Sequence, residues 1–253
     1  MKVGTDGVLL GVLSQVEGVT SLLDIGTGTG LVALMLTQRN QNMHVDAIEI
    51  DPDAAQQARE NVERSPWPHI QVHQVALQHY FPNKQYQLIV SNPPYFVHSL
   101  KAPQQARNTA RHTDTLSYAE LLQGVSRLLL PQGKFWVILP DEAQVEFCRL
   151  AAQEGLNLVQ VIKVHPREDR PAKRVVMCFE KPVVGHAGPF DKLRDRMEGC
   201  DAGLRDRMED SEVGPFDRLR DLSPQILVIE KERHVYTPLF ESLTAPYYLD
   251  RNG

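Results

Sequence analysis

The sequence predicts an α/β fold: a mostly parallel, seven-stranded sheet with helices on both faces, and a charged repeat insertion near the carboxyl end. Short apolar runs alternate with amphipathic segments along residues 21–182, the pattern of strand–helix–strand units. A glycine loop, GTGTG at 26–30, follows the first run, and a stiff SNPP segment follows the fourth. Loops at the carboxyl ends of parallel strands meet at one edge of a sheet, so we expect a ligand site there.

The opening MKVGTDG is expected to be a polar turn that leads into an apolar helix ending near Val16. Apolar runs bounded by turn residues then predict strands at 21–25, 44–50, 70–75, 86–91, 134–139, 156–164, 174–180 and 225–231. Helical periodicity predicts helices that start near residues 31 and 52, and others at 117–130, 141–154 and 237–249. Residues 131–133, Pro-Gln-Gly, are expected to form a turn before the fifth strand.

The length of 253 residues and the 42% hydrophobic content are ordinary for one globular domain. We expect residues 1–182 and 223–253 to form that domain. Residues 183–222 contain near-identical copies, GPFDKLRD with GPFDRLRD and LRDRME twice, that are too poor in apolar residues to bury a core. This segment is therefore expected to be a mobile surface insertion.

Composition also limits partners and location. No apolar run is as long as a membrane span, so we expect a cytoplasmic protein without a membrane partner. The odd, widely spaced Cys148, Cys178 and Cys200 predict neither a disulfide framework nor a zinc motif, and His69 with His73 lack ligand-spaced partners, so no metal is expected. The net charge of −5 argues against nucleic-acid binding by overall charge alone, but it leaves a local basic patch open.

The glycine loop is expected to bind a cofactor. Asp24 ends the first strand region, and Gly26, Thr27, Gly28 and Gly30 follow it. Glycines let the backbone approach a ligand closely. The G-x-G-x-G spacing differs from the dinucleotide fingerprint, whose third glycine comes one position later, and it modestly favours S-adenosylmethionine over a dinucleotide.

Glu49 lies 19 positions after Gly30, at the end of the second strand. A carboxylate there can accept both ribose hydroxyls of an adenosine-bearing cofactor, although a solvated strand end is the alternative. Asp51 is more simply the N-cap of the next helix, with Pro52 at its first position.

Asn92, Pro93, Pro94 and Tyr95 form the expected catalytic loop. Two prolines stiffen the chain, and the Asn92 side-chain oxygen together with the Pro93 carbonyl offers two uncharged acceptors for both hydrogens of a planar amine. The Tyr95 ring can stack on the group that carries the amine. In isolation this segment is equally consistent with a structural turn.

A long connection at 96–116 is rich in cations and almost free of acids. We expect Lys101, Arg107, Arg111 and His112 to contact phosphates beside the stacking site. An ordinary solvated loop is the alternative.

DIGTGTG at 24–30, IEID at 48–51 and SNPPY at 91–95 together resemble the class I S-adenosylmethionine-dependent methyltransferases, a Rossmann-like family. The opening MKVGTDGVLLG, RHTDTLS at 111–117 and YTPLFESLTAPYYL near the end are similar, more narrowly, to the tRNA1(Val) (adenine-37-N6)-methyltransferases. The resemblance covers nearly the whole chain except the repeats.

The resemblance implies direct in-line methylation of the exocyclic N6 amine of an adenine in tRNA, adenosine 37 next to the anticodon. Asn92 with Pro93 would receive the amine, and Arg107 and Arg111 would grip the anticodon arm. The further residues implied for the substrate are Tyr95, Phe96, Lys101 and His112. Those implied for the cofactor are Lys2, Thr5, Asp24, Gly26, Thr27, Gly28, Gly30, Glu49, Ile50, Ala76, Leu77 and Asn92.

Two departures from the family pattern stand out. Many relatives end the third strand with an acid that contacts the cofactor adenine amine, and this chain has Ala76 there. Relatives also commonly carry a segment before MKVGTDG, so Met1 is consistent with an internal methionine of a longer chain. Two alternative functions remain open: glutamine N5-methylation of release factors, for which only some 20 residues precede the first strand, and non-catalytic RNA binding on a methyltransferase fold.

Overall fold

One nine-stranded sheet organises the part of the chain that the computed structural model describes, residues 4–94, 116–183, 225–232 and 235–247. The strands are β1 (Ser21–Ile25), β2 (His44–Glu49), β3 (Gln71–Gln74), β4 (Tyr86–Ser91), β5 (Leu129–Pro140), β6 (Asn157–Arg167), β7 (Arg174–Glu180), β8 (Gln225–Glu232) and β9 (Val235–Tyr236). The α-helices are α1 (Thr5–Leu13), α2 (Leu31–Arg39), α3 (Pro52–Glu63), α4 (Tyr118–Leu128), α5 (Gln144–Gln153) and α8 (Pro238–Thr244). Short 3₁₀ turns are η1 (Leu77–His79), η2 (Asp141–Ala143) and η3 (Ala245–Tyr247).

The strand order is β3-β2-β1-β4-β5-β7-β6-β8-β9. The first five strands in this order are parallel, and β7 runs antiparallel to both of its neighbours. The predicted α/β class with a mostly parallel sheet is confirmed, but the sheet has nine strands rather than seven. The strand predicted at 225–231 forms β8, which pairs in parallel with β6 between Ile162 and Arg167, and the unpredicted β9 folds back on β8.

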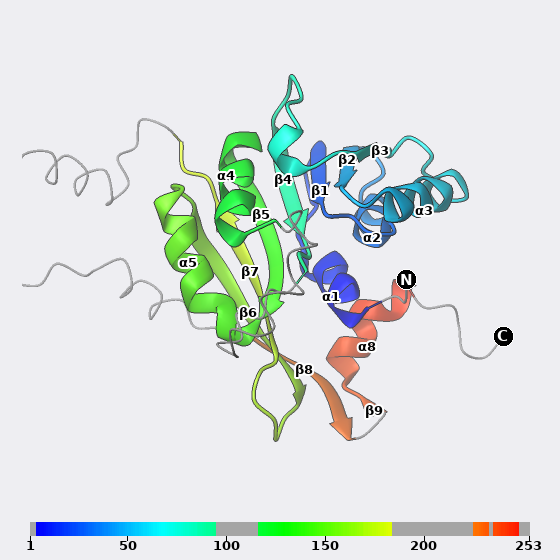
Figure 1. Cartoon of the computed structure of the whole chain (residues 1–253). Coiled ribbons are helices and arrows are strands. Elements are labelled where there is room, and N and C mark those ends of the chain that lie inside the picture. The colour runs from blue at the N-terminus through cyan, green and yellow to red at the C-terminus, as the bar shows by residue number, and fades with distance from the viewer. Residues whose placement is uncertain (1–3, 95–115, 184–224, 233–234, 248–253) are drawn as a thin grey trace, which may run out of the picture.

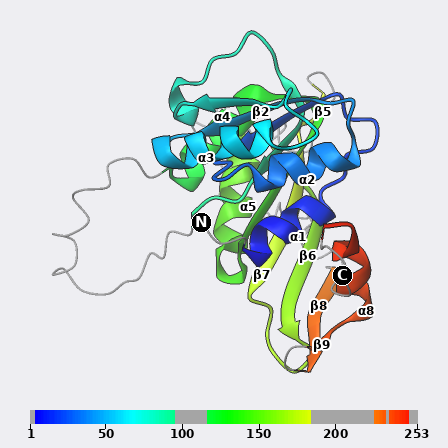
Figure 2. The ribbon, with the colours of Figure 1, turned by 90° about the vertical axis from the view of Figure 1, so that its right-hand side faces the viewer.

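Helices cover both faces of the sheet, as predicted (Figures 1 and 2). α1, α2, α3 and α8 pack on one face, and α4 with α5 packs on the other. Side chains alternate along β5, so that Phe135 and Val137 join the core beneath α4 and α5, whereas Trp136 and Ile138 join the core on the opposite face. The two apolar cores fix the helices, and with them the loops at the carboxyl ends of the strands.

Several boundaries differ from the predictions for local reasons. α1 begins at Thr5, inside the stretch expected to be a turn, and ends at Leu13. Residues 131–133 belong to β5 and form an irregularity in its pairing with β4, where Gln132 adopts a φ of 63°. The closing helix ends at Thr244 and is followed by the turn η3, with which the described residues end.

The predicted insertion at 183–222 lies outside the described residues except for Val183, so its repeats and the domain boundaries stay predictions. In the described ranges no helix is long and apolar enough to cross a membrane. The same residues contain no group of three or more His, Cys, Asp and Glu side chains placed to hold a metal ion. Cys148 and Cys178 are buried free thiols whose pKa values burial raises to about 11 and about 12.

Candidate active site

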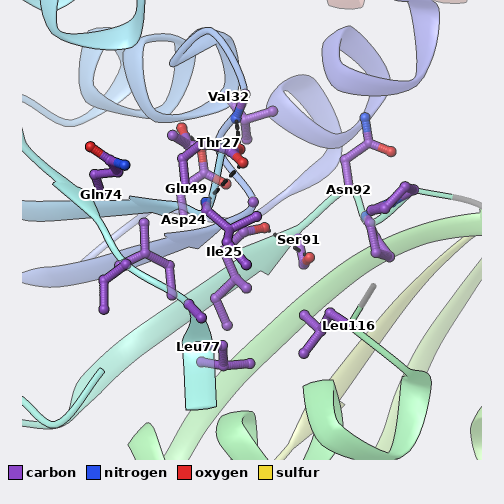
Figure 3. Close-up of a pocket in the computed structure, with 18 of the residues that line it drawn as sticks. Asp24, Ile25, Thr27, Val32, Glu49, Gln74, Leu77, Ser91, Asn92 and Leu116 are labelled. Carbon is purple, nitrogen blue, oxygen red and sulfur yellow. Dashed lines mark hydrogen bonds between the residues drawn. The ribbon is translucent and has the colours of Figure 1, made fainter. Parts of the chain in front are cut away.

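A cavity of about 960 Å³ opens where the carboxyl ends of β4, β1, β2 and β3 meet (Figure 3). Its lining combines the glycine loop after β1, the end of β2, the segment 74–79 after β3, and residues 91–94 after β4. Gly4 and Gly7 add the start of α1, and Leu116 with Glu120 adds the start of α4. A single ligand can therefore contact the ends of four neighbouring strands.

The glycine loop is held against β2 by its own backbone. The N–H groups of Gly26 and Thr27 donate to the Ile48 carbonyl at 2.9 and 3.1 Å. Gly26 and Gly28 adopt φ values of 70° and 58°, which L side chains rarely adopt, and a Cβ at either position would meet no atom within 4 Å. The loop therefore presents bare backbone to the cavity.

Gly30, a further residue that the sequence predicts to bind the cofactor, lies at the contact between α2 and α3. It does not line the cavity, although it has a φ of 83° and caps the start of α2. A Cβ at Gly30 would lie 3.5 Å from the Ala58 side chain, so this glycine lets α2 and α3 approach each other. Gly30 would affect cofactor binding through the position that it gives the glycine loop.

Asp24 is buried beneath the glycine loop, with 1% of its surface exposed. The Thr27 hydroxyl donates to Asp24 Oδ2 at 2.6 Å. Burial raises the pKa of this carboxyl to about 7, and the nearby Glu49 charge adds to the rise, while the Thr27 hydroxyl and the Ala33 N–H favour the ionised form. The carboxyl can thus change protonation state near neutral pH.

Glu49 is oriented by backbone donors on both of its oxygens. Gly28 N–H donates to Oε2 at 2.8 Å, and the N–H groups of Ile50 and Asp51 donate to Oε1 at 2.9 and 3.0 Å. A carboxylate has about four acceptor positions, so capacity for a hydroxyl remains on the side that lines the cavity. The Asp51 side chain accepts from Ala54 N at 2.8 Å, which confirms the predicted N-cap of α3.

The wall beyond Glu49 is mostly apolar. Val75 N donates to the Glu49 carbonyl at 2.9 Å, so the segment after β3 crosses close to the end of β2. Leu77 is buried, whereas 46% of Ile50 is exposed, as an apolar ligand face would require. Ala76 lines the cavity without a side-chain acceptor, and its carbonyl accepts from His79 N at 2.9 Å.

Asn92, Pro93 and Pro94 leave the end of β4 and line the cavity, with Asn92 on the opposite side from Glu49 (Figure 3). Ser91 Oγ donates to the Ile25 carbonyl at 2.9 Å and holds the end of β4 against β1. Pro93 is buried and Asn92 half-buried. The backbone at this point is thereby stiff and fixed to the strand that carries the glycine loop.

Most described residues of the predicted site meet in this cavity. Those that line it are Asp24, Gly26, Thr27, Gly28, Glu49, Ile50, Ala76, Leu77, Asn92, Pro93 and Pro94. Thr5 does not line it, because it starts α1 with an exposed side chain while Gly4 and Gly7 line the cavity instead. The predicted residues Lys2, Tyr95, Phe96, Lys101, Arg107, Arg111 and His112 lie outside the described residues.

Sequence reasoning missed several lining residues: Gly4, Gly7, Gln74, Gln78, His79, Ser91, Leu116 and Glu120. For Glu120 a signal was present, since Ser117-x-x-Glu120 is a capping box that marks where α4 starts after the loop that follows β4. For Gln78 no local pattern exists, because its place depends on how η1 packs against α4.

Residues 3–163 match the model of the methyltransferase small domain. A protein from Phocaeicola vulgatus named tRNA1(Val) (adenine(37)-N6)-methyltransferase is 39% identical over 251 residues, which cover 99% of this chain and 92% of the relative. A protein of the same name from Bacteroides fragilis is 51% identical over 185 residues, 71% of this chain and 77% of the relative. The chain belongs to the tRNA1(Val) (adenine(37)-N6)-methyltransferase family.

Membership in this methyltransferase family confirms the resemblance carried by DIGTGTG, IEID and SNPPY. The crystal structure of a predicted O-methyltransferase from Agrobacterium tumefaciens superposes with a TM-score of 0.63 at 16% identity, over 95% of this chain and 96% of that one. At this identity the likeness concerns the fold alone. The class I methyltransferase fold predicted from the sequence is therefore confirmed.

Proposed function

We propose that this methyltransferase transfers a methyl group from S-adenosylmethionine to the exocyclic N6 amine of adenine 37 in tRNA1(Val). Family membership supports the reaction and the substrate. The observation that carries the proposal is the shared cavity, in which the glycine loop, the oriented Glu49 carboxylate and the Asn92-Pro93 loop lie at neighbouring strand ends.

The residues of the cavity fit S-adenosylmethionine. Gly26 and Gly28 leave open space for the methionine part, and the remaining acceptor capacity of Glu49 suits a ribose hydroxyl. Ile50 and Leu77 offer apolar faces for the adenine ring. When bound, the cofactor supplies a methyl group on a positively charged sulfur.

Asn92 and Pro93 prepare the attacking nitrogen. The lone pair of an aromatic amine is delocalised into its ring, which makes the amine a poor nucleophile. If the Asn92 side-chain oxygen and the Pro93 carbonyl accept the two N–H hydrogens, the nitrogen is held toward the tetrahedral geometry that attack requires. The stiff Pro93-Pro94 backbone and the Ser91–Ile25 bond keep these acceptors preorganised.

The tRNA part of the proposal involves residues beyond the described ranges. Tyr95 would stack on the extruded adenine, with Phe96 beside it. Lys101, Arg107, Arg111 and His112 would contact phosphates of the anticodon arm. An anticodon loop is single-stranded, so extrusion of its base costs less than extrusion from a duplex. Because tRNA is the substrate, we place the protein in the cytoplasm.

Parallel incubations with labelled S-adenosylmethionine test the proposal. The purified chain is given unmodified tRNA1(Val), the same tRNA with adenine 37 replaced by guanine, a release factor, or duplex DNA. We expect label only in the unaltered tRNA, with nuclease digestion releasing it as N6-methyladenosine. Label in the release factor would replace the proposal with glutamine methylation, and RNA binding without any transfer would favour a non-catalytic role.

A further inference from the structure

Three carboxylates line the cavity: Asp24, Glu49 and Glu120. Asp24 lies beneath the glycine loop, and Glu49 ends β2. Glu120 comes from the first turn of α4 and contacts η1, the turn that follows β3. It therefore lies at the wall beyond Glu49. The proposed function assigns no role to the negative charge of Glu120.

Glu120 is held in a defined place relative to that wall. Gly124, one helical turn later on the same face of α4, leaves room for Leu77, because a Cβ there would lie 2.5 Å from Leu77 Cδ2. The Arg127 guanidinium donates to the carbonyls of Leu77 at 3.1 Å and Tyr80 at 2.8 Å. These contacts fasten α4 to η1, so the backbone that carries Glu120 has a fixed position beside the wall.

The two oxygens of Glu120 are engaged to different degrees. Oε2 accepts from Ser117 N at 2.8 Å and from Ser117 Oγ at 2.7 Å, which completes the capping box. Oε1 accepts from Gln78 Nε2 at 3.2 Å, a long bond from an exposed side chain. The Ser117 bonds lower the pKa of Glu120, so the carboxylate is charged at neutral pH. Oε1 can exchange the Gln78 bond for a ligand donor.

The surrounding wall suits a flat ring with a donor at its edge. Ile50, Val75, Leu77 and Leu116 are apolar residues that line the cavity, while Ala76 has no side-chain acceptor. A carboxylate accepts hydrogen bonds from a ring amine and repels a ring carbonyl. The charge therefore distinguishes a 6-amino purine from a 6-oxo purine.

We propose that Glu120 Oε1 accepts a hydrogen bond from the 6-amino group of the cofactor's adenine and makes the cavity selective for adenine over hypoxanthine. The inference rests on the proposed use of S-adenosylmethionine and adds the residue that reads its base. Gln78 moves aside or bridges when the ring enters, and the Ser117 bonds keep the carboxylate aimed at the wall.

Calorimetry with S-adenosylhomocysteine and S-inosylhomocysteine tests this without turnover. The two ligands differ at two neighbouring positions of the base: adenine has a 6-amino group and an acceptor at N1, whereas hypoxanthine has a 6-oxo group and an N1–H donor. A hydrogen bond to a charged group corresponds to about 10- to 100-fold in affinity, and we expect the unmodified chain to prefer the amino ligand by about that factor. Glu120→Ala should reduce the preference to within about threefold.

Two further variants separate recognition from helix capping. Glu120→Gln keeps a capping box, and its amide can accept from an amine or donate to a carbonyl, so the preference should fall while the protein stays folded. Ser117→Ala removes the hydroxyl bonds of the cap but keeps the Ser117 N–H bond to Glu120 Oε2, so the carboxylate stays oriented and the preference should persist. A preference that survives Glu120→Ala and Glu120→Gln would overturn the inference, as would an equal loss in Ser117→Ala. If the unmodified chain binds both ligands equally, the proposal for Glu120 is overturned but the proposed function is not. If it binds neither ligand, the proposed function is overturned as well.

Discussion

Asp24→Asn should change the stability of the cofactor-free protein in a strongly pH-dependent way. Burial raises the pKa of the Asp24 carboxyl from its ordinary 3.8 to about 7. Between these values the folded chain keeps a proton that the unfolded chain has released, so raising the pH lowers the free energy of unfolding. Each pH unit corresponds to about 1.4 kcal/mol, which gives about 4 kcal/mol of destabilisation above pH 7 and none below pH 3.8.

Asparagine removes this ionisation but offers one acceptor oxygen to the Thr27 hydroxyl and the Ala33 N–H, a loss of about 1–3 kcal/mol at every pH. The variant should therefore be about as stable as the parent at pH 5 and more stable at pH 8. The interval from pH 5 to the Asp24 pKa spans about two pH units. Over that interval the difference in free energy of unfolding between the variant and the parent should therefore change by about 3 kcal/mol.

Urea unfolding of both proteins at pH 5, 6, 7 and 8 measures this difference, in which the other titrating groups largely cancel. Thr27→Val is the matched control. It removes the hydroxyl that favours the ionised form, so the pKa of Asp24 should rise further, and the stability of that variant should keep falling to a higher pH than that of the parent. If the stability difference between Asp24→Asn and the parent is the same at all four pH values, the pKa of Asp24 is not raised by burial.

Three further predictions concern the surrounding structure. Gly124→Ala should lower the free energy of unfolding by about 1 kcal/mol. Overpacking against Leu77 costs about 1–3 kcal/mol, and the higher helix propensity of alanine offsets about 1 kcal/mol of that cost. Unchanged urea unfolding would count against a close contact between Gly124 and Leu77. Lys101→Ala with Arg107→Ala should weaken tRNA binding and reduce the dependence of log affinity on log salt by roughly one per charge, measured by filter binding, and an unaltered slope would exclude these side chains as phosphate contacts. Deletion of residues 183–222 should leave tRNA methylation largely intact, so a folded but inactive deletion would show that the repeats contribute to the reaction.

Buried strands were the most predictable elements of the fold. Ser21–Ile25, Tyr86–Ser91 and Arg174–Glu180 form strands with the bounds expected from their sequence. Each is a mostly apolar run between polar or turn residues, and burial on both faces removes the ambiguity of an exposed strand. The glycine loop and the Asn92 loop follow two of these strands directly, so their meeting at one edge of the sheet followed from topology.

Features that depend on tertiary packing could not be found in this way. Thr5–Leu13 begins in a glycine-punctuated polar stretch, yet it is helical because its apolar side chains pack against α2. The glycine spacing predicts a cofactor contact at Gly30, but it does not show that this glycine also packs against Ala58 of α3. The bond between Gln78 and Glu120 joins residues 42 positions apart and exists only because α4 packs on η1. No local sequence pattern encodes such a pair.

Methyl transfer by Asn92→Ala tests directly whether Asn92 accepts the amine hydrogens of adenine 37. The variant and the parent are each incubated with S-adenosylmethionine and unmodified tRNA1(Val), and N6-methyladenosine at position 37 is quantified by mass spectrometry of digested tRNA. Calorimetry with S-adenosylhomocysteine and a thermal melt accompany the assay. We predict loss of transfer by at least about 100-fold, the size of effect expected when a preorganised acceptor is removed, with near-normal cofactor affinity and folding. Transfer at the parent's rate by a folded Asn92→Ala protein would contradict the mechanism.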